Sequence, residues 1–205
     1  MTNKLREELI RVEAALQAAK QILARQEYVI TDQQAQLRIP LVISLIDQAI
    51  EHHEAMLLLI TRDMTGSAFA LARSVVEGVY RGLWINQGAT HEEIQRFTQK
   101  DEISISMGKL SEVIDASNNT ETFFADLKKR SWDVLNSYTH NGMMQLSRRF
   151  TGTDLQPAYT DGQISEIMTI VTTRILLLIM SFLGLRGHAN ERAEVEALLK
   201  SLCLS

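Results

Sequence analysis

The chain has 205 residues, of which 45% are hydrophobic and 22% charged, and its net charge at pH 7 is -4. This balance excludes a global attraction to nucleic acid or to an anionic membrane, so a polyanionic partner would have to meet a local basic patch. Only 10 Gly and 2 Pro interrupt the chain, which favours long helices. We therefore predict an all-α fold, a helical bundle of about seven or eight helices in a single domain.

Two features of the chain predict a cytoplasmic location. The single cysteine, Cys203, has no partner for an internal disulfide, as is typical of a reducing compartment. The N-terminal segment interleaves charged with apolar residues and lacks the continuous apolar run of a secretory signal.

The first predicted helix, residues 3–26, carries an apolar stripe with heptad spacing. Such a stripe packs either on a partner, which would make the chain a homodimer or bind it to another protein, or along its own bundle. Thr31 and Asp32 are plausible caps in the segment that follows. The stripe consists of Leu5, Leu9, Val12, Leu16, Ala19 and Leu23.

The helices that follow are delimited by cap residues. Pro40 suits the first turn of a helix that begins at Ile39, because a first-turn N–H has no partner within the helix. Later segments open with capping boxes, in which a Thr and a Glu or Gln three residues on bond each other's backbone N–H. The predicted helices are 39–62, 68–87, 91–99, 109–116, 121–138 and 143–150, followed by an apolar helix that ends near 184 and a last helix that ends at 202. The boxes are Thr90/Glu93 before 91–99 and Thr160/Gln163 before the apolar helix. Residues 118–120 and Asn190 are further predicted caps, and 151–159 is a predicted loop.

The run Glu51-His52-His53-Glu54 offers two imidazoles and two carboxylates and so resembles a metal site. Consecutive helix residues point about 100° apart, whereas ligands on one face need steps of three or four. Only Glu51 and Glu54 share a face. We therefore predict a polar seam at the bundle or its mouth and no bound metal.

The segment Ile167–Leu185 is apolar enough and long enough to cross a bilayer. It contains Arg174, which would cost about 2.5 kcal/mol or more at the centre of a membrane. A buried central helix has the same all-round apolarity. We predict a central bundle helix and no membrane partner.

The third helix carries Arg73, Glu77 and Arg81 four residues apart, on one stripe that reaches Trp84. In one interpretation the three side chains form a structural ladder of ion pairs with one another and bind no ligand. In the other, a guanidinium remains free to hold a phosphate or carboxylate, while Glu77 positions it or acts as a general base. The excess of positive charge favours an anionic ligand.

A second polar group surrounds His140, in the turn Tyr138-Thr-His140-Asn141-Gly142. An imidazole beside arginines suits metal-independent RNA cleavage, in which the ring takes the 2′-OH proton and a guanidinium stabilises the phosphorane. A histidine that merely caps or bridges two helices is the alternative. The surrounding basic residues are Lys128, Lys129, Arg130, Arg148 and Arg149.

The chain has no P-loop, no dinucleotide-binding glycines, no Gly-x-Ser-x-Gly elbow and no Cys/His zinc spacing. This pattern excludes several common enzyme classes. We expect no cofactor.

The Arg-x3-Glu-x3-Arg-x2-Trp helix and the Tyr-Thr-His-x-Gly turn resemble a family of uncharacterised bacterial helical proteins, loosely related to HEPN-type bundles of abortive-infection and toxin–antitoxin systems. The resemblance covers about residues 40–186 and implies a HEPN-like core over 39–186, between an N-terminal helix in 1–30 and a C-terminal helix in 190–205. It also implies a bundle that is often dimeric, with a polar cleft that cuts RNA without metal. HEPN ribonucleases place an arginine four to six residues before the histidine, whereas Arg130 precedes His140 by ten. The expected partner of His140 is therefore Arg73 or Arg81, from another helix.

Two hypotheses follow from these patterns. The first is a cytoplasmic effector of defence or toxin type that binds RNA or another phosphate-bearing ligand and acts as a metal-independent ribonuclease. The second is a non-catalytic, dimeric interaction protein whose charged stripe is structural. The catalytic residues of the first would be His140, Glu77 and Arg73, and its ligand-binding residues Arg81, Trp84, Tyr138, Asn141 and Arg148.

Overall fold

The computed structural model describes residues 1–28, 33–100, 102–103, 105–152 and 154–203. The all-α, single-domain bundle is confirmed: the described residues form nine helices, against the seven or eight expected, and one short hairpin. The elements are α1 (Asn3–Ala24), α2 (Gln33–Thr61), α3 (Thr65–Gln87), α4 (His91–Lys100), α5 (Met107–Asn118), α6 (Phe123–Thr139), α7 (Met143–Leu146), the 3-10 turn η1 (Ser147–Arg149), β1 (Phe150–Thr151), β2 (Asp154–Leu155), α8 (Asp161–Leu185) and α9 (Ala189–Cys203).

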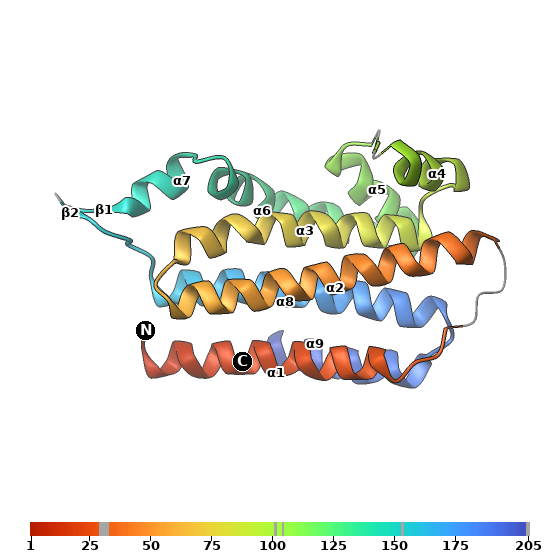
Figure 1. Cartoon of the computed structure of the whole chain (residues 1–205), viewed down its shortest axis with the longest axis horizontal. Coiled ribbons are helices and arrows are strands. Elements are labelled where there is room, and N and C mark those ends of the chain that lie inside the picture. The colour runs from red at the N-terminus through yellow and green to blue at the C-terminus, as the bar shows by residue number, and fades with distance from the viewer. Residues whose placement is uncertain (29–32, 101, 104, 153, 204–205) are drawn as a thin grey trace.

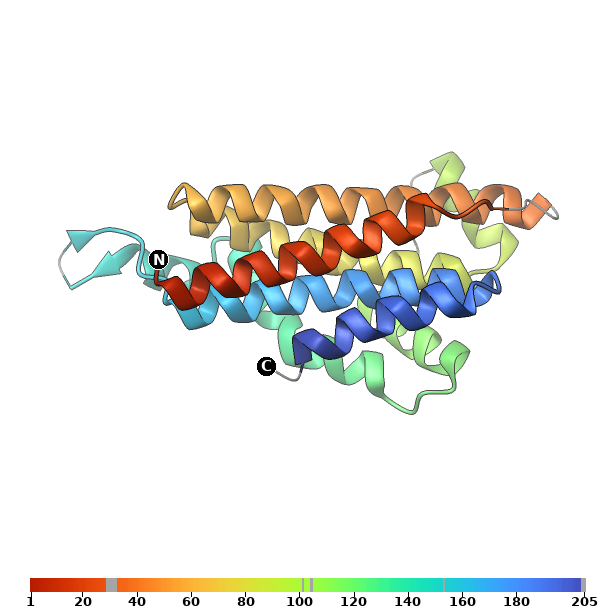
Figure 2. The same cartoon turned by 90° about the horizontal axis from the view of Figure 1, so that it is seen from below.

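The long helices lie in layers along the long axis of the molecule (Figure 1). Helices α2, α3 and α8 form the middle, with α1 and α9 on one side and α5 and α6 on the other. Helix α8 packs against α1, α2, α3 and α9, which places it at the centre, as Figure 2 also shows from below. Helix α3 packs against α2, α8, α5 and α6 and therefore has one face in the core and one towards α6.

Helix α8 has the length and composition of a membrane span, but 61% of its most apolar window is buried inside the bundle. Its arginine, Arg174, is buried and bonds the Tyr80 hydroxyl of α3, which donates to the Phe124 carbonyl at 2.7 Å. Burial raises the pKa of Tyr80 to about 12, although Arg174 acts in the opposite direction. This buried network gives the arginine a partner in the core.

The heptad stripe of α1 packs within the chain. Leu5, Leu9, Val12, Leu16 and Ala19 are buried, and α1 lies against α8 and α9. The residues that suggested a partner subunit are thus used by the bundle itself. Dimerisation stays a prediction.

The start of α2 was predicted wrongly. The helix begins at Gln33 rather than Ile39, so Pro40 lies inside it and not in its first turn. The guanidinium of Arg38 donates to the carbonyls of Ile85 and Ala89 at the end of α3, which ties the early turns of α2 to the bundle. This tertiary contact outweighs the helix-breaking tendency of proline. The proposed caps at positions 31 and 32 lie outside the described residues.

Both capping boxes are confirmed, since Thr90 pairs with Glu93 and Thr160 with Gln163. The caps predicted at 118–120 and at Asn190 are wrong. Helix α6 begins at Phe123, and its first N–H groups are capped from α5 by Asp115, because that buried carboxylate lies opposite the helix end. Residue 190, predicted as a cap, lies inside α9, which starts one residue earlier.

The segment 143–150 is not one helix. It contains the four-residue α7, the turn η1 and the start of a hairpin in which Phe150 pairs with Leu155. This segment projects from the end of the bundle beyond α6 (Figure 1), where few core contacts are available to extend a short helix.

Candidate functional site

The charged stripe of α3 lies along the face towards α6, half-buried. Glu77 bridges both arginines: its Oε2 lies 3.7 Å from Arg73 Nη2 and its Oε1 lies 2.5 Å from Arg81 Nη2. The exposed side-chain fractions of Arg73, Glu77 and Arg81 are 22%, 25% and 37%. The ladder is therefore internally paired but open to solvent, and not sealed in the core.

The imidazole of His140 meets this stripe. Arg73 Nη1 bonds His140 Nε2, as predicted for an arginine from another helix. A guanidinium has no acceptor, so Nε2 must supply the lone pair and the ring proton must sit on Nδ1. The lone pair of His140 Nε2 is therefore engaged by Arg73 in this contact.

The turn that presents His140 has a defined backbone. His140 caps α6, and Asn141 follows in the left-handed conformation, with φ of 54°. The Gly142 N–H then donates to the Ser137 carbonyl at 2.8 Å, which makes a Schellman-type helix end. Thr139 Oγ1 lies 3.2 Å from the Ala70 carbonyl and ties the turn to α3. Asn141 therefore has a backbone role here, and its side chain is exposed.

Trp132 belongs to the same group, although the sequence analysis did not select it. The Arg73 guanidinium carbon lies 5.2 Å from the centroid of the Trp132 ring, within cation–π distance. The sequence does contain a signal for Trp132: it precedes His140 by about two helical turns, so the two side chains lie on the same face of the helix. Trp84, chosen instead, is 2% exposed and packs in the core, because it lies on the part of α3 that neighbouring helices cover. We call Arg73, Glu77, Arg81, Trp132 and His140 the α3–α6 cluster.

The chain belongs to a family of unknown function, DUF6988. The family model matches residues 46–201, which include α3, α6 and all five members of the α3–α6 cluster. Comparison with curated proteins and with solved structures gives no match. The family itself names no activity, so a function must be inferred from the geometry.

Two of the predicted ligand residues lie elsewhere. Tyr138 is buried and packs edge-to-face on Phe69, with ring centroids 5.0 Å apart. With Arg148 it lines a pocket of about 190 Å³ between α6, α7 and α8. Of the predicted ligand-binding residues, Arg81 lies in the α3–α6 cluster and Tyr138 and Arg148 line this second pocket, whereas Trp84 lies in the core and Asn141 is exposed in the turn.

The polar run of α2 does not form one seam, because its side chains diverge around the helix. His53 is fully buried, and its Nε2 lies 2.9 Å from Thr172 Oγ1 of α8. Glu54 accepts from Gln17 of α1 at 2.9 Å, while Glu51 is exposed.

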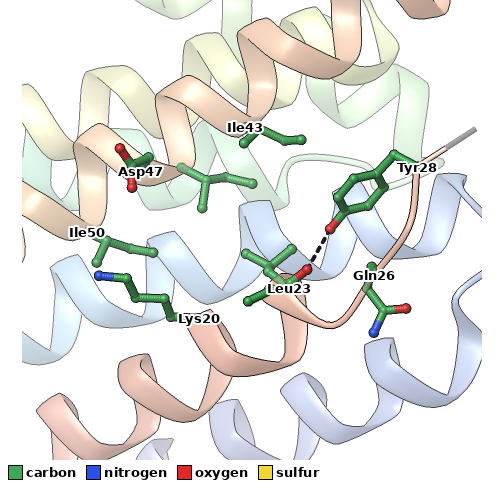
Figure 3. A pocket seen from close by; sticks show the side chains of 9 residues that line it. Lys20, Leu23, Gln26, Tyr28, Ile43, Asp47 and Ile50 are labelled. Carbon is green, nitrogen blue, oxygen red and sulfur yellow. Dashed lines mark hydrogen bonds between the residues drawn. The ribbon is translucent and has the colours of Figure 1, made fainter. Parts of the chain in front are cut away.

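The most voluminous pocket that we describe, about 410 Å³, lies between α1 and α2 (Figure 3). Its wall is largely apolar, and two of its polar groups have local partners: the Tyr28 hydroxyl donates to the Leu23 carbonyl at 3.1 Å, and Lys20 pairs with Glu54. Most of its lining lies before residue 46, outside the family match. The α3–α6 cluster is therefore the stronger candidate for a site shared by the family.

Proposed function

We propose that this chain binds RNA, or another phosphate-bearing ligand, at the α3–α6 cluster. The observation that carries the proposal is the position of Arg73, whose guanidinium contacts Glu77, the His140 ring and the Trp132 ring together. Guanidinium groups bind phosphate through paired N–H donors. An indole beside them offers a surface on which a base stacks.

We further propose metal-independent RNA cleavage as the reaction at this site. When Arg73 turns from the ring to the phosphate, the lone pair of His140 Nε2 is released and would take the proton of the 2′-OH. The 2′-oxygen would then attack the phosphorus, the bond to the 5′-oxygen would break, and that oxygen would take a proton from water. Arg73 would stabilise the phosphorane charge. Glu77 holds both arginines in place.

The cellular role that we propose, a cytoplasmic effector of defence or toxin type in bacteria, rests on the resemblance stated for the sequence. The competing proposal is a non-catalytic homodimer with a structural ladder. It is favoured by one observation, that Glu77 already pairs with both arginines. The two proposals differ in whether the cluster binds a ligand.

The test is the affinity for a fluorescently labelled single-stranded RNA, measured by anisotropy over a series of salt concentrations. We expect Arg73→Ala to weaken binding roughly tenfold or more and to lower the salt dependence by about one counterion. Lys4→Ala is the matched control, because it removes one positive charge from an exposed position on α1. Equal affinities of the two variants would refute the ligand site.

Cleavage is tested separately on the same RNA in the presence of a chelator. We expect His140→Ala to lose cleavage while it keeps most of the binding, because the imidazole acts on the 2′-OH and the arginines hold the phosphate. Full cleavage by His140→Ala would remove that residue from the mechanism. Absence of RNA binding by the unmodified chain would leave the interaction protein as the better proposal.

A further inference from the structure

The pocket that Tyr138 and Arg148 line is a neighbour of the α3–α6 cluster but shares no residue with it, because Tyr138 packs on Phe69 of α3 whereas His140 contacts Arg73. Tyr138 and His140 are two residues apart on or next to α6, so their side chains point roughly 160° from each other. The pocket measures about 190 Å³, which is below the range of roughly 300–1,000 Å³ for drug-sized ligands. It therefore suits a single flat ring system and not a larger molecule.

The charges at this pocket are of both signs and do not pair. Arg130, Arg148 and Glu166 line it, and none of the three forms an ion pair with any residue that the structure describes. The Nε of Arg148 is buried and has no acceptor within the described chain. Buried polar groups of native proteins are normally bonded. Arg130 and Glu166 are exposed, so a ligand with both donors and acceptors would replace water on them and would supply a partner for Arg148 Nε.

The remainder of the lining is mostly apolar and aromatic, with Ser131 and Gln163 as its uncharged polar residues. Phe69 and Tyr138 pack edge-to-face, and Leu135, Ile167 and Ile170 complete the wall. Such a wall accommodates the flat faces of an aromatic ring, while the charged groups read its edges. The lining thus combines the apolar wall and the charged groups that a pocket for a nucleic-acid base needs.

We propose that this pocket binds guanine. The N1–H and the 2-amino group of guanine are adjacent donors that match the two oxygens of the Glu166 carboxylate. Its O6 and N7 are adjacent acceptors that match an arginine guanidinium, here Arg148 or Arg130. Adenine lacks the paired donors, and cytosine offers only its 4-amino group to a carboxylate.

If the pocket selects a base of bound RNA, its role rests on the proposed function. A strand that crosses the turn after α6 would meet the pocket and the α3–α6 cluster one after the other. The guanine would then fix the position of the strand, and its phosphate would meet Arg73. The same pocket would take the base of a free guanine nucleotide without the cluster.

The first experiment is calorimetric titration of the full chain with GMP, AMP, CMP and UMP. We expect GMP to bind roughly tenfold or more tightly than the other three, because one bidentate base contact distinguishes bases by this factor. Glu166→Gln should abolish the difference between GMP and AMP, since an amide carries only one acceptor oxygen. Glu194→Gln, on the exposed part of α9, is the matched control.

The second experiment compares two labelled RNAs that differ by one guanine in place of adenine. Preference for the guanine RNA that Glu166→Gln removes supports the pocket in RNA recognition. GMP preference without any RNA binding supports a free-nucleotide site and refutes the proposed function alone. Equal binding of all four nucleotides and of both RNAs, or a guanine preference that survives in Glu166→Gln, overturns the guanine pocket, whatever Arg73→Ala does to RNA binding.

Discussion

The buried histidine of α2 makes the stability of the protein sensitive to acid. Thr172 Oγ1 donates to the Met168 carbonyl at 2.7 Å, so its contact with His53 must be one in which His53 Nε2–H donates. The Nδ1 of the ring is buried without a partner among the described residues, which favours the neutral ring, because a proton there would have no acceptor. Burial lowers the pKa of His53 from 6.5 to about 4, although Glu54 acts in the opposite direction.

This shift sets the size and direction of the pH effect. The pKa is lower in the folded state, so the unfolded chain binds more protons between pH 6.5 and 4, and the free energy of unfolding falls as pH falls through this window. The contribution of His53 relative to neutral pH is a loss of about 2 kcal/mol at pH 5 and about 3 kcal/mol at pH 4.

Urea unfolding followed by circular dichroism at pH 7, 6, 5 and 4 measures this effect in the wild type and in His53→Leu. Other groups also titrate, so the quantity of interest is the difference between the two proteins. The wild type should lose about 3 kcal/mol more than the variant by pH 4. His52→Leu, one residue away and only half-buried, is the control and should follow the wild type. Parallel curves for wild type and His53→Leu would refute the argument.

Two further substitutions test how the elements around the cluster are held. Asp115→Ala removes a buried carboxylate that caps α6, so it should lower the free energy of unfolding by about 3 kcal/mol; a loss below about 0.5 kcal/mol in urea unfolding would contradict this. Gly142→Ala places a Cβ 2.4 Å from Ser137 Oγ and 3.0 Å from its Cα, so the turn must open and move His140. It should abolish RNA cleavage while the far-ultraviolet circular dichroism stays unchanged, and retention of full cleavage would count against the geometry proposed for the turn.

The helical architecture was predictable because periodicity and caps are local signals. The boxes at Thr90 and Thr160 involve residues three apart, and both form as expected. The start of α2 was not predictable, because it depends on Arg38 reaching carbonyls about fifty residues later in the chain. The cap of α6 by Asp115 likewise comes from a neighbouring helix.

The candidate site was predictable in part for a similar reason. The stripe Arg73, Glu77 and Arg81 follows from helix geometry alone. The lack of a suitable arginine before the histidine led to the prediction that Arg73 or Arg81 meets His140, and the structure shows the contact with Arg73. The separation of Tyr138 from His140 was also implied by their spacing, but their partners on α3 are known only from the structure: Tyr138 packs on Phe69, and His140 contacts Arg73.

The partial exposure of the α3–α6 cluster bears on why it exists. Ion pairs at such positions contribute roughly 0–1 kcal/mol to stability, because solvent screens them and ordering the side chains costs entropy. Stability alone is therefore a weak reason for two arginines and a glutamate beside the core face of α3. Replacement of Arg73 by Ala should change the free energy of unfolding by about 1 kcal/mol or less, although it changes RNA affinity roughly tenfold. If the ladder served only the fold, Arg73→Ala would instead lower the free energy of unfolding substantially and leave the RNA affinity unchanged.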